Sequence, residues 1–539
     1  MPGQRELAAL LVLAVVGTVA FGYFVTSSPA ASVPLEHSQG DAAATATQFL
    51  EERGYDPAAF RTSTVFTARG RSATFIQRQL DGRRERAALR QNHVYGWETR
   101  FYRPLEPETF RVAVDARTGE VVRFTRQVPD EAPGGNLSRA AALERARAFL
   151  RATGHDLDRY ERISSSSTER PNRVDHTFVW KHVDRQVASA PYYVEVTLHG
   201  ERIGGYDQHI NVPDAFAHQY QVQQNRGLVL SVAFLGLSLL LLVAAIWFGL
   251  RYYKADAFDG RYALAVGGSV AGLTALGAVN SVPQLEHGVP TTIAPLPFLL
   301  IAVGGAVLVG IVIGAVAAVT AGAGKQLSAE VLGVEPLTRL RPLLANAERR
   351  RDVAVRLAAG VLLAGVVLGV YAVFYLVGTR FFDFWLPSQP PQVGAVTLYV
   401  PALAALVAGG TAALWEEVTY RLFAIPLTKR YLRYTALAVV LPAIVWGLGH
   451  AGYAVLPFWA RAVEVSLIGV VLGIAFLRYG VEATIAAHFT VNATVTAVPM
   501  LRAGTPWLVA QGGIAAAIAL LPALAAVALY VYGRPAPDA

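Results

Sequence analysis

Long apolar runs occupy most of this chain and are separated by short polar segments. The first run covers residues 7–25. Nine more lie near residues 228–250, 262–283, 292–321, 356–378, 396–425, 434–453, 462–477, 481–499 and 507–532. Because a membrane-spanning helix needs about 20 predominantly apolar residues, the pattern predicts an all-α polytopic membrane protein with about ten transmembrane helices.

One long polar segment, residues 30–226, interrupts this pattern and predicts an inserted α+β domain. Two stretches, 111–124 and 193–203, alternate like strands around a tight turn and predict hairpins. The segment also repeats a pattern, FLxxxGxD, at residues 49–56 and 149–156. Each copy predicts a helix end with a glycine cap, so the domain is expected to contain an internal repeat.

The first apolar run has two interpretations. Residues 1–29 are either an uncleaved membrane anchor or a signal peptide that is cleaved within residues 27–31. The run is about as long as a spanning helix, which favours the anchor. The chain then divides into this anchor, the polar domain, helices over residues 227–389, and a C-terminal helical region over residues 390–539.

Lysine and arginine are distributed unequally between the short loops. One set of loops contains 15 of these residues, including Arg339, Arg341 and Arg534, and the opposite set contains 3. Positive loops stay in the cytoplasm. The chain is therefore expected in the cell membrane with both termini cytoplasmic and residues 30–226 extracytoplasmic.

The amino-acid composition further limits the class of protein and the kinds of site it can contain. Hydrophobic residues make up 53% and charged residues 16%, against roughly 25% charged in an average soluble domain. The net charge of +8 arises mainly in loops and forms no basic stripe interleaved with aromatic residues, so no nucleic-acid partner is expected. The chain has no cysteine, which excludes disulfides, thiol catalysis and cysteine-type zinc sites.

Ionisable residues inside apolar spans are costly, and here they cluster between residues 416 and 492. Glu416 and Glu417 follow an apolar run, and Glu417 lies one helical turn before Arg421, close enough to pair with it. Glu416 points about 100° away from this pair and is free to act as a general base. The alternative is that these three residues only mark the interfacial end of a helix.

Two further polar groups lie on the following apolar runs. His450 ends one run, four residues after Trp446, and His488 and Asn492 share a face of another. An Asn side chain can donate hydrogen bonds to a developing oxyanion. The alternatives are a core histidine and interhelical hydrogen bonding.

The combination is more specific than its parts. EExxxR, an aromatic residue four positions before a His, and HxxxN follow one another over residues 390–500. This order resembles the CAAX protease and bacteriocin-processing family of intramembrane proteases. The resemblance implies that Glu416 and His450 activate the attacking water, that His488 and Asn492 stabilise the oxyanion, and that Glu417 and Arg421 support the site.

Two departures from the family pattern are visible. Members commonly have Phe-Arg-Gly around the arginine and Phe before the middle histidine, whereas this chain has Tyr420-Arg421-Leu422 and Trp446. The missing glycine puts the local backbone path in question. In the polar domain, the sequence VDxxTGEV at residues 114–121 resembles PepSY-type modules, which are associated with peptidases.

The resulting expectation is an intramembrane endopeptidase of glutamic or metallo type, acting on a membrane-associated protein or peptide within the lipid bilayer. One divalent metal ion such as zinc, held by Glu416, His450 and His488, is an open possibility. A non-enzymatic membrane receptor and a proton-coupled transporter remain as alternatives. One difficulty is depth: Glu416 lies about 15 Å before the predicted loop and His450 about 23 Å after it.

Overall fold

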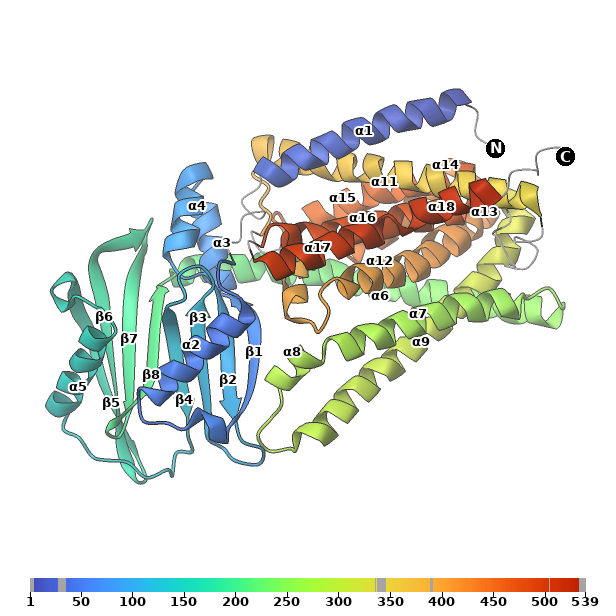
Figure 1. Cartoon of the computed structure of the whole chain (residues 1–539). Helices are drawn as coiled ribbons and strands as arrows, with labels where there is room; N and C mark the ends of the chain where they lie inside the picture. Colours follow the sequence, from blue (N-terminus) through green and yellow to red (C-terminus); the bar gives the residue numbers. More distant parts are fainter. Residues whose placement is uncertain are drawn as a thin grey trace.

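The structure, a computed structural model, describes residues 4–27, 35–334, 336, 346–387, 391–503 and 505–532. Residues 28–31 of the predicted cleavage region lie outside this range, as do Arg339, Arg341 and Arg534. The described chain forms a sheet domain, residues 35–210, and a helical bundle (Figure 1). The sheet domain lies at one end of the bundle, and α1 begins and α18 ends at the other end (Figure 1).

Eight antiparallel strands form one sheet in the order β1-β2-β3-β4-β8-β7-β6-β5. Each half of the sheet begins with one helix and contributes four strands, with α3 and α4 inserted between the first two strands of the first half, and β4 and β8 meet in the centre. The elements of the first half are α2 (Gln39–Glu51), β1 (Arg61–Ala68), α3 (Gly70–Gln79), α4 (Gly82–Gln91), β2 (Tyr95–Tyr102), β3 (Thr109–Asp115) and β4 (Val121–Gln127). Those of the second half are α5 (Arg139–Ala152), β5 (Tyr160–Arg170), β6 (Arg173–Val187), β7 (Ala190–His199) and β8 (Arg202–Ile210).

The repeated sequence pattern has the same local structure in both halves. Gly54 and Gly154 follow α2 and α5 with φ angles of +73° and +85°, which favour glycine. Two residues further on, Asp56 and Asp156 each cap a short 3-10 helix through the side chain. The two predicted hairpins are present as the pairs β3–β4 and β7–β8.

The helical bundle contains all ten predicted apolar segments, but not all are long helices. Seven described helices are long and apolar enough to cross a membrane, or eight if the bent pair α17–α18 is one span. The remaining two of the ten predicted segments contain α12 and α14, which have 14 residues each. The elements are α1 (Gln4–Ser27), α6 (Asp214–Lys254), α7 (Gly260–Asn280), α8 (Val282–His287), α9 (Pro295–Leu332), α11 (Ala347–Phe381), η4 (Pro391–Thr397), α12 (Leu403–Glu416), η5 (Glu417–Ala424), α13 (Ile425–Leu432), α14 (Thr435–Leu448), α15 (Ala460–Tyr479), α16 (Val481–Leu501), α17 (Pro506–Ala519) and α18 (Leu521–Tyr532).

Helix α1 packs along α11 (Figure 1). A Cβ atom at Gly17 would lie 2.2 Å from the carbonyl oxygen of Gly365, so the two backbones are in direct contact. Near its N-terminus, Glu6 accepts hydrogen bonds from Arg478 at 2.8 Å and from Tyr479 at 2.7 Å. Helix α1 is therefore an integral part of the bundle.

A buried ionic cluster joins the sheet domain to α8. The carboxylate of Glu98 on β2 lies 3.1 Å from His287 Nε2 and 2.7 Å from Arg111. Burial alone would raise the pKa of Glu98, but the hydrogen bond with His287 and the guanidinium groups of Arg123 and Arg111 lower it to about 2. The sheet domain is thus docked on the bundle through a carboxylate that stays ionised.

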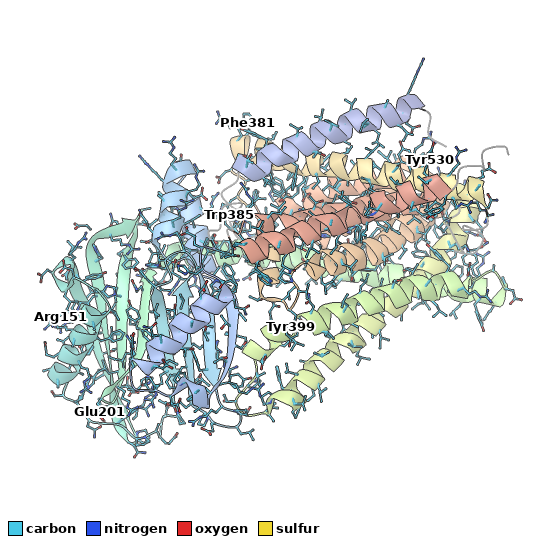
Figure 2. All side chains as sticks on the ribbon, in the orientation of Figure 1. Arg151, Glu201, Phe381, Trp385, Tyr399 and Tyr530 are labelled. Atoms are coloured by element: carbon cyan, nitrogen blue, oxygen red, sulfur yellow. The ribbon has the colours of Figure 1, made fainter. Side chains whose placement is uncertain are left out.

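Figure 2 identifies the two ends of the bundle through its labelled side chains. Phe381 and Trp385 lie at the end that faces the sheet domain, and Tyr530 lies near the opposite end. Since α11 leads from the far end to Phe381, the loop that follows it contacts the sheet domain directly: Asp383 accepts two hydrogen bonds from Arg78.

Candidate active site

The EExxxR sequence lies where an α-helix changes its pitch. Helix α12 ends at Glu416, and η5 continues from Glu417 to Ala424 as a π-helical segment before α13 begins. Pro426 has no N–H, and its ring would clash with the carbonyl of Leu422 in a regular helix, which favours wider turns before it. Such segments are frequent at functional sites.

Glu417 lies at the centre of a buried ionic network. Its side chain is 0% exposed and that of Arg421 is 1% exposed; their closest atoms are 3.1 Å apart. The second partner of Glu417 is His488, whose Nδ1 lies 2.9 Å from the same carboxylate oxygen. Because a carboxylate only accepts hydrogen bonds, Nδ1 of His488 carries a proton. Glu417 therefore holds one helix of the site to another and fixes the ring of His488.

Glu416 points to a different neighbour. Its Oε2 accepts a hydrogen bond of 2.5 Å from the indole N–H of Trp446 on α14. The indole ring also covers the guanidinium group of Arg421 at 4.1 Å. Nδ1 of His450 lies 3.0 Å from the backbone oxygen of Trp446. Trp446 thus links Glu416, Arg421 and His450.

The difference in depth expected from the sequence is absent. The predicted loop was placed too early, because α13 continues the helical path to Leu432 and α14 begins at Thr435. Glu416 precedes Leu432 by 16 residues and His450 follows Thr435 by 15. At about 1.5 Å per residue the two side chains lie at nearly equal depth.

A cavity of about 950 Å³ opens beside these residues. Glu416, His450, His488 and Asn492 all line it, whereas Glu417 and Arg421 lie behind its wall. Within the described residues the side chain of Asn492 has no hydrogen-bond partner, so its amide is available to a bound molecule. The sequence prediction that adjacent carboxylates face different surroundings corresponds to this arrangement.

The donors proposed for a metal ion do not converge. Among the residues that the structure describes, no three His, Asp or Glu side chains come together in a way that could hold a metal. No step below is therefore assigned to a metal.

The structure adds a charged pair that the sequence reasoning missed. Arg461 and Glu464 line the same cavity, form an ion pair on α15, and leave Glu464 completely buried. The signal was present in the sequence, because Glu464 is an ionisable residue inside the apolar run 462–477. Arg461 precedes that run and is one of the three basic residues in the less positive set of loops.

Comparison with known proteins bears on this helical region. Residues 398–494 match the family model described as Type II CAAX prenyl endopeptidase Rce1-like. This match confirms the resemblance to the CAAX protease family. The matched range includes Glu416, Glu417, Arg421, His450, His488 and Asn492.

One curated relative is the sporulation-killing factor biosynthesis protein SkfC of Bacillus subtilis (strain 168). It is 27% identical over 85 residues, which is 16% of this chain and 17% of the relative. The chain thus matches only a small part of that protein's length. No solved structure matches the chain. The family match does not extend to the sheet domain, and the resemblance of residues 114–121 to PepSY modules is not confirmed.

Proposed function

We propose that this chain is an intramembrane endopeptidase that hydrolyses a peptide bond in a membrane-associated protein or peptide. The observation that carries the proposal is the convergence of a carboxylate, two imidazoles and an amide from α12, from the turn that follows α14, and from α16 on one cavity. These groups are the types required to activate water and to stabilise an oxyanion. The match to a prenyl endopeptidase family over the same helices supports it.

In the proposed reaction, water lies between Glu416 and His450 in the cavity. Glu416 accepts a proton from water as its oxygen attacks the carbonyl carbon, which gives a tetrahedral intermediate with a negative oxygen. Asn492 and His488 donate hydrogen bonds to that oxygen. The intermediate collapses when the C–N bond breaks and the proton passes from Glu416 to the leaving nitrogen, giving a carboxylic acid and an amine, between which the acid proton then passes to give a carboxylate and an ammonium group.

The role of His488 sets a condition on its charge. Since Nδ1 donates to Glu417, donation from Nε2 to an oxyanion requires the imidazolium form. In that form the cluster holds two carboxylates, Glu416 and Glu417, and two cations, Arg421 and His488, and is electrically balanced. A balanced cluster is far less costly in an apolar bundle than one with an excess charge.

The proposed orientation places the sheet domain outside the cytoplasm and both ends of the chain inside. The unequal loop charges support it. It agrees with the arrangement in Figure 1, where the sheet domain lies at one end of the bundle and the start of α1 and the end of α18 lie at the other.

The test is cleavage of a library of membrane-anchored peptides by purified protein in detergent. We expect the wild type to cleave and Glu416→Ala and His488→Ala to lose cleavage while remaining folded. Matched controls are Glu348→Ala and His218→Ala, which replace exposed residues outside the cavity and keep activity. Cleavage that survives both site substitutions would refute the assignment of residues, and cleavage by no form would refute the protease proposal for this library.

A further inference from the structure

The active-site cavity is not confined to the membrane helices. Its wall also includes the N-terminal part of α3 in the sheet domain, through Gly70, Arg71, Ala73, Thr74 and Gln77. The same continuous cavity is lined by Glu416 and His488. Figure 1 shows α3 where the sheet domain meets the bundle. A molecule that fills the cavity therefore contacts both parts of the chain.

Helix α3 is held in this position by contacts at several points. The ring of Phe75 packs edge-on against Phe216 at the start of α6, with centroids 5.1 Å apart. Arg78 donates to both carboxylate oxygens of Asp383, at 3.0 and 2.9 Å. One ring contact and one ion pair therefore hold this short helix in place, so that α3 forms a fixed part of the cavity wall.

The charges on the cavity wall differ between the two parts. In the bundle, in the first turn of α15, the positive charge of Arg461 is neutralised by Glu464. At the mouth, Arg71 is exposed, and its side chain has no ion pair or hydrogen bond to any other described residue. The mouth of the cavity therefore carries an unneutralised cation, which attracts a negatively charged group.

We infer that α3 binds the segment of the substrate that leaves the membrane on the side of the sheet domain, and that Arg71 selects substrates with a carboxylate in this segment. The inference rests on the proposed function. The carboxylate comes either from an Asp or Glu side chain or from the C-terminus of the substrate, and both present the same charge to a guanidinium group. Arg71 is then a specificity-determining residue that acts outside the bilayer.

Contact can be tested without catalysis. The chain has no cysteine, so Gly70→Cys creates a single thiol beside an intact Arg71, and a Cβ atom at position 70 meets nothing within 4 Å. In a Glu416→Gln background, a bound peptide is not cleaved. We expect an acidic membrane-anchored peptide to slow maleimide labelling at position 70 at least several-fold. Labelling of Arg84→Cys, an exposed site on α4 that does not line the cavity, should stay constant. Equal labelling rates with and without peptide at position 70 would overturn the inference.

Selectivity is tested with peptides that differ only in the segment beyond the membrane. One set carries Glu, Gln or Lys there, and a second has a free or an amidated C-terminus. We expect the wild type to prefer the carboxylate form by about tenfold in kcat/KM, as for a charge pair at a solvent-exposed rim. Arg71→Glu should reverse the preference toward Lys, and Arg84→Glu should not. A preference within the Glu, Gln and Lys set identifies a side-chain carboxylate as the group that Arg71 binds, and a preference for the free over the amidated peptide identifies the C-terminus.

Two results would refute this role of Arg71. One is an unchanged Glu-to-Lys ratio in Arg71→Glu. The other concerns protein reconstituted into lipid vesicles. If the cleavage rate there depends on the fraction of anionic lipid instead of the peptide charge, a lipid headgroup is the partner of Arg71. If the proposed protease function itself fails, no variant cleaves any peptide, but the labelling experiment still decides whether α3 contacts the peptide.

Discussion

Glu417→Gln is the most informative substitution in the buried network. Glutamine keeps the size of the side chain but removes the charge that faces Arg421 at 3.1 Å and His488 at 2.9 Å. Arg421 is 1% exposed and would become an uncompensated buried cation. Breaking a buried pair in this way costs about 3–5 kcal/mol. The variant should therefore melt several degrees lower than the wild type in detergent.

The same substitution should also reduce cleavage. The glutamine amide no longer specifies which tautomer and orientation His488 adopts, and a lost hydrogen bond to a charged group is worth about 1.5–3 kcal/mol, or roughly 10- to 100-fold in rate. The matched control is Glu330→Gln, whose pair with Arg430 at 3.4 Å is partly exposed and contributes at most about 1 kcal/mol.

A double variant separates stability from positioning. In Glu417→Gln with Arg421→Met, no charge is left unpaired, so most of the melting temperature should return. Cleavage should stay low, because the orientation of His488 is still lost. Thermal unfolding and peptide cleavage are measured on the same preparations. If Glu417→Gln melts and cleaves like the wild type, the ionic network does not stabilise the protein or support cleavage. If the double variant recovers full activity, Glu417 does not position His488.

Three further substitutions test other parts of the structure. Trp446→Phe keeps an aromatic ring, smaller than the indole, but removes the donor to Glu416, so kcat should fall about tenfold with little change in KM. Glu98→Gln should lower the melting temperature at neutral pH. The depressed pKa of Glu98 means that its contribution, up to about 3 kcal/mol, is present above pH 4.5 and lost as the pH falls to about 2, so the wild type should lose more stability over this range than the variant. Gly17→Val should displace α1 at a cost of about 1–3 kcal/mol, measured as melting temperature, whereas Gly22→Val, where a Cβ meets nothing within 4 Å, should be neutral.

Local spacing predicted much of the candidate site. The four-residue separation of Glu417 and Arg421 is enough for a pair on one helix, and the structure contains it. The contrast between adjacent carboxylates follows from the 100° step of a helix. These predictions succeeded because they depend on one element and need no knowledge of its neighbours.

Predictions that needed helix boundaries were less accurate. The loop after the EExxxR helix was placed by the end of the apolar run near residue 425, but the helical path continues through polar residues to Leu432. The predicted span 434–453 is also longer than its helix, because α14 ends at Leu448 after 14 residues. Hydropathy detects the apolar part of a helix, whereas hydrogen bonding and packing decide where the helix ends.

Contacts between distant segments could not be predicted from the pattern. The pairing of Glu98 with His287 joins residues 189 positions apart, and the position of α3 on the cavity depends on the docking of the whole sheet domain. Arg461 and Glu464 become candidate site residues only once the structure shows that they line the same cavity as His450. The polar residues of each helix can be identified from the sequence, whereas their partners depend on how the helices and the sheet domain pack together.

The proposed mechanism gives each of the two adjacent glutamates a separate role, with Glu416 as the base and Glu417 as the residue that supports it. A base facing the cavity must be placed by a helix whose own position is fixed, and in an apolar bundle few polar contacts are available for that purpose. Glu417 supplies such contacts to α16 through His488 and to its own helix through Arg421. Arg421 in turn lies against Trp446, which donates to Glu416. The buried ionic network and Glu416, which lines the cavity, are therefore linked by one continuous chain of contacts, so a substitution of Glu417 should also shift the position of Glu416.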